Sequence, residues 1–426
     1  MQRQKTAELL KSQQFLFLLL EQIFTQVAYH LVNFSLILSV FKLTNSNFSV
    51  AILLLCFYLP SAIFVTIAGL TSDFVHRKKI IILSNLVWST LVFTLSFLTK
   101  QFWTICLFAV LIQIADEFFF NAITSSIPNI VPKDQLLLAN SLFNLTFYSS
   151  MVAGSFLVSL LSRFISPVAP LYFASGLTAF GAFFVSKIKI KQVVPSAPKR
   201  KILLQNIFQE ITKGWQTIHE NSTIKTLTLF LVVSNSLLSL AYAIAPGLLS
   251  VFGIDATDFS FVLILPLGIG MIAGNLILSK LGKKYRKIFF IQKGLIIIGA
   301  VLLILAFIPK SNHLNSLTHK RMNFEKKLGI SLPLSLLFSF LGIGGVLTFI
   351  PATTAFQENL PEEVRGRTQS TNQLLTYITS TILAFFSGSI SDLLGFFPLL
   401  LVLSILSLTS GLLSKKILIK AGVLQN

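Results

Sequence analysis

Charged residues are scarce in this chain, and their scarcity excludes a water-soluble protein of ordinary composition. Only 12% of the 426 residues are Asp, Glu, Lys or Arg, whereas soluble domains carry roughly 25%. The hydrophobic share is 54%, and the mean hydropathy is +0.80. Because so little polar surface cannot cover a globule of this length in water, the composition predicts that a lipid bilayer is the solvent.

Cysteine and recognisable catalytic motifs are also missing or rare. The two cysteines, Cys56 and Cys106, lie in separate apolar runs, and neither belongs to a CxxC pair. This excludes a disulfide framework and a thiolate metal site. The five histidines are scattered, and the sequence contains no HExxH motif and no GxxxxGK(S/T) phosphate-binding loop. We therefore expect no metal, no other cofactor and no enzymatic activity.

Long apolar runs are what the chain has in abundance. A transmembrane helix needs about 20 mostly apolar residues, and its backbone groups must pair within the segment, because lipid offers them no partners. Twelve runs meet this requirement: residues 15–41, 48–72, 79–98, 102–128, 140–163, 168–187, 225–251, 258–280, 288–308, 330–356, 368–391 and 396–415. The sequence thus predicts an all-α polytopic membrane protein with twelve spans.

The basic residues predict how these spans are oriented. The net charge is +19, but Lys and Arg fall in short clusters between the apolar runs. Cytoplasmic loops of membrane proteins are enriched in Lys and Arg, and most of the 34 basic residues lie in cytoplasmic segments if both termini are cytoplasmic. We expect that orientation, and we expect no nucleic-acid partner.

A long polar stretch near the middle divides the chain into two halves. We predict an N-terminal six-helix bundle over residues 1–190, a cytoplasmic central loop with an amphipathic helix over 191–224, and a C-terminal six-helix bundle over 225–426. The loop after span four, PKDQLLLANSLFN, corresponds to the loop after span ten, PEEVRGRTQSTNQ. Two parallel six-helix repeats of this kind build one large class of secondary transporters.

The loop between spans two and three, GLTSDFVHRKK, gives the strongest local signal. It resembles motif A of the major facilitator superfamily, with Gly69, Asp73, Arg77 and Lys78 at the characteristic positions. The resemblance implies that these residues form an inner gate. A glycine permits close helix approach, and an aspartate at the membrane edge can cap a helix N-terminus or pair with an arginine.

Three further segments are similar to bacterial macrolide-efflux and enterobactin exporters of that superfamily. They are NAITSSIPNIVPKDQLLLANSLFN, GWQTIHENSTIKTLTLF and SGSISDLLG. The similarity implies a multi-pass protein of the bacterial cell membrane that exports a drug-like or siderophore-like molecule by proton antiport. However, span four contains no Lys or Arg, and Gly154 is nearly alone where antiporters carry a Gly-Pro-rich motif in span five. These departures leave the proton coupling open.

Four ionisable residues stand out inside the predicted spans: Glu21 and His30 in span one, and Asp116 and Glu117 in span four. A charge at the centre of the bilayer is costly, so such residues mark transport pathways or proton relays unless they only join helices by hydrogen bonds. Adjacent residues of a helix point about 100° apart, so only one of Asp116 and Glu117 can face a given cavity. The four residues are our candidates for binding a proton or the substrate.

These observations favour a monomeric transporter that works by alternating access in the lipid bilayer. We predict an amphipathic small-molecule substrate, with protons as the coupling ion. Import or facilitated diffusion of a small metabolite is the alternative within this class. The alternative from another class is a transporter-like membrane protein that binds without transporting, as a sensor or an accessory subunit.

Overall fold

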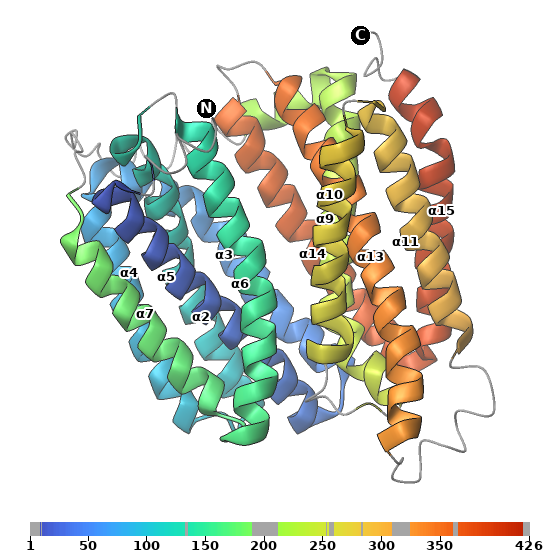
Figure 1. Ribbon diagram of the computed structural model, residues 1–426, viewed down its shortest axis with the longest axis horizontal. Helices are drawn as coiled ribbons and strands as arrows, with labels where there is room; N and C mark the ends of the chain where they lie inside the picture. Colours follow the sequence, from blue (N-terminus) through green and yellow to red (C-terminus); the bar gives the residue numbers. More distant parts are fainter. Residues whose placement is uncertain are drawn as a thin grey trace. The chain divides into compact units, whose positions relative to one another are not determined.

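The computed structural model describes residue 9 and residues 11–132, 135–189, 212–252, 254, 260–282, 284–308, 324–360 and 365–420. Long helices account for most of these residues (Figure 1). They are α2 (Gln13–Thr44), α3 (Asn47–Phe74), α4 (Arg77–Phe97), α5 (Phe102–Ile130), α6 (Leu136–Phe164), α7 (Ala169–Lys187), α9 (Ser222–Val251), η3 (Ser260–Ile264), α10 (Leu265–Leu281), α11 (Lys287–Phe307), α13 (Phe324–Glu358), α14 (Arg365–Leu394) and α15 (Phe396–Lys420).

The prediction of an all-α polytopic protein is confirmed. Each predicted span coincides with a helix whose ends differ from the prediction by a few residues, and the described residues contain no strand. In the described part, eleven helices are long and apolar enough to cross a membrane. The seventh predicted span lies within α9, which is 30 residues long.

The helices belong to two compact units. The N-terminal unit comprises residues 1–43 and 59–207, and the C-terminal unit comprises residues 44–58 and 208–426. In the first, α4 packs against α5 and α7; in the second, α11 packs against α13 and α15, and α9 packs against α14. Helix α3 is divided between them, since its first part has its contacts in the C-terminal unit. The predicted boundaries of the central loop stay a prediction, because residues 190–211 lie outside the described residues.

Each unit has an apolar interior. The N-terminal unit buries Phe15, Ile81 and Phe119 in one cluster, and the C-terminal unit buries Leu227 and Phe356 in another. Such burial is not what distinguishes a membrane protein, because soluble helical proteins also pack apolar side chains inside. The distinguishing feature is found on the outer faces of the helices.

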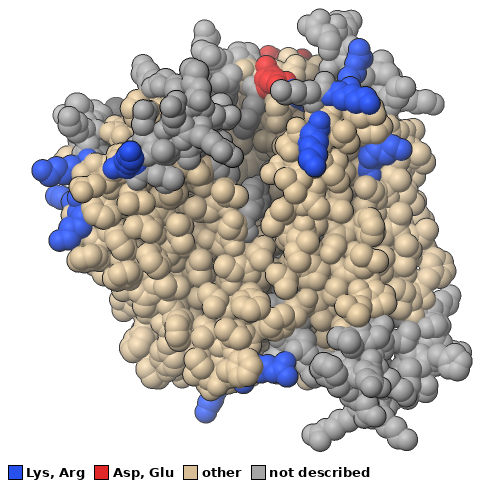
Figure 2. Space-filling view, in the orientation of Figure 1, with Lys and Arg blue, Asp and Glu red and all other residues tan. Residues whose placement is uncertain are grey.

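The outer helix faces are apolar over long distances. On α5, Trp103 is 72% exposed, Leu107 58% and Leu111 39%, at the four-residue spacing of one helix face. Figure 2 shows that, on the visible faces, Lys and Arg lie toward the two ends of the helices, with a broad band between them that carries none. Apolar stripes this long would be unfavourable in water, so these faces are suited to contact lipid.

The eighth span begins with a π-helix, η3, which the sequence analysis did not predict. Pro266 follows directly in α10, and a proline has no N–H to donate to the carbonyl four residues earlier, which is that of Val262. The hydroxyl of Ser335 in α13 donates to the Val262 carbonyl at 3.2 Å. Neighbouring hydroxyls and local π geometry are the usual means of accommodating a proline within a membrane span.

Candidate functional site

Glu21 is the most completely buried of the predicted site residues. It lies on α2 with no exposed surface. Its Oε1 accepts hydrogen bonds from Thr25 Oγ1 at 2.8 Å and from Asn85 Nδ2 of α4 at 2.9 Å. Its Oε2 is buried and has no hydrogen-bond partner among the described residues. The carboxyl group is therefore held firmly through one oxygen only.

Helix α7 packs beside the Glu21 side chain. A Cβ atom added at Gly181 would lie 3.0 Å from Thr25 Oγ1 and 3.7 Å from Glu21 Cγ. The carboxyl group thus occupies the place where α2, α4 and α7 meet. An ionised carboxylate enclosed by three membrane helices is costly, and a bound proton or cation would remove that cost.

His30 lies two turns further along α2, where α6 crosses it. The imidazole is hydrogen-bonded to the backbone of Phe147, and the two rings lie 5.4 Å apart. Gly154 permits the close crossing, because a Cβ there would lie 2.7 Å from His30 Cβ and 3.2 Å from the Val27 carbonyl oxygen. The surroundings of His30 are those of a residue that joins two helices, and its predicted role in transport stays a prediction.

Asp116 and Glu117, the two adjacent acids on α5, differ in how far they are buried. Glu117 is buried, and its Oε2 accepts a hydrogen bond from Asn121 Nδ2 at 3.4 Å. Asp116 is half-buried, and one turn away on its face lies Phe120, which is exposed. The two acids therefore have different surroundings, as their positions on a helix require, and Asp116 is the more accessible of the two.

The basic residues of the predicted inner gate bind helix ends within the N-terminal unit. Arg77 donates hydrogen bonds to the Ser125 carbonyl and to Asn129 Oδ1, in the last two turns of α5. Lys78 Nζ donates to the carbonyl oxygens of Ser186 and Ile188, each at 2.8 Å, at the C-terminal end of α7. Cations are favourable at the negative ends of helix dipoles, so this loop stabilises the unit locally.

The structure says less about the other two residues of the predicted inner gate, Gly69 and Asp73. A Cβ added at Gly69 would meet its nearest neighbour, Asn121 Oδ1, at 3.6 Å, which is an ordinary contact distance. Among the described residues, a methyl group would therefore fit beside Gly69, and the predicted role of this glycine in the gate stays a prediction. The side chain of Asp73 lies outside the described residues, so its predicted pairing with Arg77 stays a prediction.

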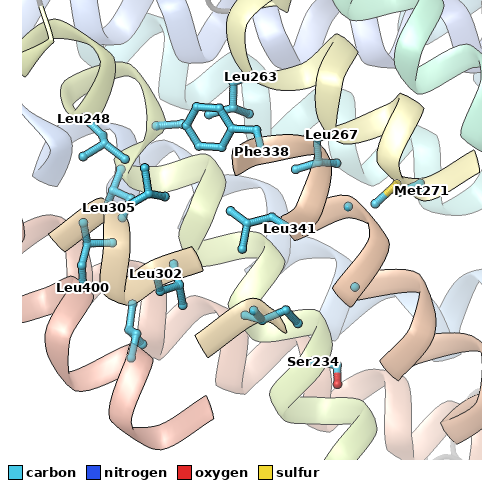
Figure 3. A pocket seen from close by; sticks show the side chains of 16 residues that line it. Ser234, Leu248, Leu263, Leu267, Met271, Leu302, Leu305, Phe338, Leu341 and Leu400 are labelled. Atoms are coloured by element: carbon cyan, nitrogen blue, oxygen red, sulfur yellow. The ribbon is translucent and has the colours of Figure 1, made fainter. Parts of the chain in front are cut away.

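Sequence reasoning missed a cavity inside the C-terminal unit. Its volume is about 110 Å³, and its walls come from α9, η3, α10, α11, α13 and α15. Figure 3 shows aliphatic and phenylalanine side chains, among them Leu263, Phe338 and Leu341, converging on it from several helices. None of the described lining residues is ionisable. Among them Ser234 carries a hydroxyl, which donates to the Phe230 carbonyl of its own helix.

An uncharged apolar group is the occupant that this cavity suits, because no lining charge is available to pair with an ion. No stretch of sequence could have predicted the cavity, since six segments contribute to it. Among the described residues, no group of three or more His, Cys, Asp or Glu side chains could hold a metal ion.

Solved structures of several transporters have the fold of this chain. The POT family transporter PepTSo aligns with a TM-score of 0.74 at 10% identity, over 97% of this chain and 99% of that chain. The nucleoside transporter NupG aligns with a TM-score of 0.68 at 13% identity, over 95% and 98%. A bacterial homolog of the human lysosomal transporter Spinster, inward-facing and unoccupied, aligns with a TM-score of 0.64 at 15% identity, over 96% and 95%.

Identities this low show the shared fold and leave the substrate undetermined. A search of curated proteins gave no match. The family model described as the Major Facilitator Superfamily matches residues 18–378, which is most of the chain and includes Glu21, His30, Asp116 and Glu117.

Proposed function

Because this chain belongs to the Major Facilitator Superfamily and is therefore a transmembrane transporter, we propose that it exports an amphipathic small molecule in exchange for protons. The observation that carries the proposal is the buried carboxyl group of Glu21, of which only one oxygen is hydrogen-bonded. The exporter branch is supported by the resemblance of the segments around spans four, seven and eleven.

Protonation of Glu21 couples to helix packing through its two oxygens. When a proton is bound at Oε2, the group is neutral, and Thr25 and Asn85 satisfy Oε1. When the proton leaves, the charge is shared with Oε2, which then requires a donor. Either α2, α4 and α7 shift to provide one, or water enters. Loss of the proton therefore favours a different packing of these helices, which is the two-state behaviour that transport needs.

The apolar cavity of the C-terminal unit supports the amphipathic nature of the substrate. A cavity of about 110 Å³ with uncharged walls can hold a small ring or a short aliphatic group, since engineered apolar cavities of roughly 150 Å³ stay dry and bind benzene. A polar part of the same substrate would have to be bound elsewhere. Asp116 is the more accessible of the two acids on α5 and is our candidate for contacting a cationic part.

The test is transport of a lipophilic fluorescent cation into inside-out vesicles with and without an imposed proton gradient. Wild-type protein is compared with Glu21→Gln, which keeps the oxygen that Thr25 and Asn85 bind but cannot exchange a proton. The matched control is Glu358→Gln, which removes an exposed acid paired with Lys287. We expect Glu21→Gln to abolish gradient-driven accumulation while Glu358→Gln retains it.

Two other results would contradict parts of this proposal. Accumulation by Glu21→Gln at the wild-type rate would exclude Glu21 as the coupling site. If folded wild-type protein moves none of a broad panel of dyes in either direction, the exporter proposal is wrong. The hypothesis to test would then be uptake of a small metabolite, or a role as a sensor or an accessory subunit.

A further inference from the structure

Asp392, near the C-terminal end of α14, accepts hydrogen bonds from the beginning of α3. Its Oδ1 accepts from the Asn47 backbone N–H at 3.0 Å and from Asn47 Nδ2 at 2.8 Å. Its Oδ2 accepts from the Phe48 backbone N–H at 3.0 Å and from Ser46 Oγ at 2.6 Å. One carboxylate thus accepts four hydrogen bonds from three consecutive residues that precede it by about 345 positions in the chain.

These bonds complete the N-terminus of α3. The first four N–H groups of a helix have no partner within it. In α3 these are the groups of residues 46 to 49: the Ser46 N–H donates to Thr44 Oγ1 at 3.4 Å, those of Asn47 and Phe48 donate to Asp392, and that of Ser49 donates to Ser46 Oγ at 3.2 Å. A carboxylate at this end of a helix also interacts favourably with the helix dipole. Two of the four groups therefore depend on a residue of another helix.

The contact continues as a close seam between the two helices. A Cβ added at Gly388 would lie 2.7 Å from the Asn47 carbonyl oxygen and 2.8 Å from Ala51 Cβ. The rings of Phe48 and Phe385 lie 5.1 Å apart in an edge-to-face arrangement. Because any side chain at position 388 would separate the backbones, the seam is tight where Asp392 binds.

Helix α3 continues into the N-terminal unit only after Tyr58, whose ring stacks on that of Tyr377 of α14. Beyond residue 58 it is assigned there, and Ser61 Oγ, for example, accepts a hydrogen bond from Gln113 Nε2 of α5 at 3.0 Å. One continuous helix therefore has its first turns bound in one unit and the remainder bound in the other. Alternating access, on which this inference rests, requires such shared contacts to be made in one state and broken in another.

We propose that Asp392 is a latch, whose carboxylate holds the start of α3 in the C-terminal unit in one conformational state and releases it in the other. Its exposure suits this role. Asp392 is an exposed residue, so on release water can hydrate both the carboxylate and the freed N–H groups. Exposed charge–dipole contacts contribute only modestly to stability, and such a contact can be broken and remade during a transport cycle.

The test measures opening of the seam and needs no substrate. In full-length protein with Cys56 and Cys106 replaced by alanine, Ala51→Cys places a thiol in the seam, where Ala51 is fully buried. The rate of alkylation by a water-soluble maleimide then reports how often the seam opens. The matched control is Ala174→Cys, equally buried and likewise in the second turn of its helix, but on α7 of the N-terminal unit.

We expect Asp392→Asn to raise the alkylation rate at position 51 roughly fivefold to thirtyfold, which corresponds to one or two kcal/mol, and to leave position 174 unchanged. Ser46→Ala, which removes one donor to the carboxylate, should act in the same direction. An unchanged rate at position 51 in Asp392→Asn and Asp392→Ala would overturn the proposal, and so would an equal rise at position 174. Neither result depends on whether a transported dye is found, so failure of the export proposal would be recognised separately.

Discussion

Glycines at helix crossings show how much a single atom matters in this protein. Gly154 and Gly69 both lie within predicted spans, but their surroundings in the structure differ. At Gly154 an added Cβ would lie 2.7 Å from His30 Cβ, whereas at Gly69 the nearest atom would be 3.6 Å away. Neither glycine has a positive φ, so backbone conformation does not distinguish them, and only the space beside each one does.

Gly154→Ala should destabilise the protein, and Gly69→Ala should not. Both substitutions change the unfolded chain in the same way, so the difference between them isolates packing. Overpacking typically costs about 1–3 kcal/mol, and at Gly154 the obstructing atoms are a Cβ and a backbone oxygen, which cannot move aside. The measurement is thermal unfolding of both variants in detergent. Equal melting temperatures would show that α2 and α6 separate easily at this crossing.

The candidate site could be predicted residue by residue but not as an arrangement. Glu21 was identifiable because an acid within an apolar run is conspicuous, and nothing nearby in the sequence indicated that Asn85, 64 residues away, would bind it. Asp392 lies at the end of α14, and nothing near it in the sequence indicates a distant partner. The structure instead gives it partners on α3. Long-range pairs depend on which helices become neighbours, and hydropathy carries no such information.

At the scale of whole helices, the sequence was informative because the bilayer restricts the choices. Lipid requires each span to be a helix of a certain length, so apolar runs translate directly into α2 to α15. Local departures from the α-helix are less predictable. Pro266 lies within the eighth predicted span, but whether the helix kinks, ends or widens there depends on the donors that neighbouring helices supply. Here Ser335 of α13 is such a donor.

Ser335→Ala should loosen the junction between η3 and α13. It removes the hydroxyl that bonds the Val262 carbonyl, and interhelical bonds of this kind are worth about 0.6–2 kcal/mol in membranes. Ser339→Ala is the matched control, because the Ser339 hydroxyl donates only to the Ser335 carbonyl of its own helix. We expect a lower melting temperature for the first variant only. Identical behaviour would mean that the π geometry alone satisfies the Val262 carbonyl.

At the scale of the whole molecule, the two units differ in the groups they bury. The N-terminal unit encloses a carboxyl group at Glu21, and the C-terminal unit encloses an uncharged cavity. If the proposed function is right, proton binding and binding of the apolar part of the substrate are assigned to different units. Substitutions in one unit should then change coupling, and substitutions in the other should change selectivity.

Gly345→Leu tests this division of roles. Gly345 lines the cavity, and a Cβ there would meet nothing within 4 Å, so a leucine can enter the cavity without a clash at its first atom. We expect transport of bulky apolar substrates to fall about tenfold or more, since a loss of 1.4 kcal/mol is already tenfold, with stability maintained. Gly176→Leu, at an equally open but exposed position on α7, should leave transport unchanged. Equal transport by both variants would exclude the cavity as a substrate site.

The partnership of α3 with Asp392 also has a consequence for biogenesis. Asn47 and Asp392 are 345 residues apart, so the ribosome must make most of the chain before the first turn of α3 can meet its acceptor. Until α14 has been inserted, the N–H groups of Asn47 and Phe48 have only the water of the headgroup region as a partner. Correct assembly of the second predicted span therefore waits for the eleventh, and a chain truncated before residue 392 would leave α3 without this cap.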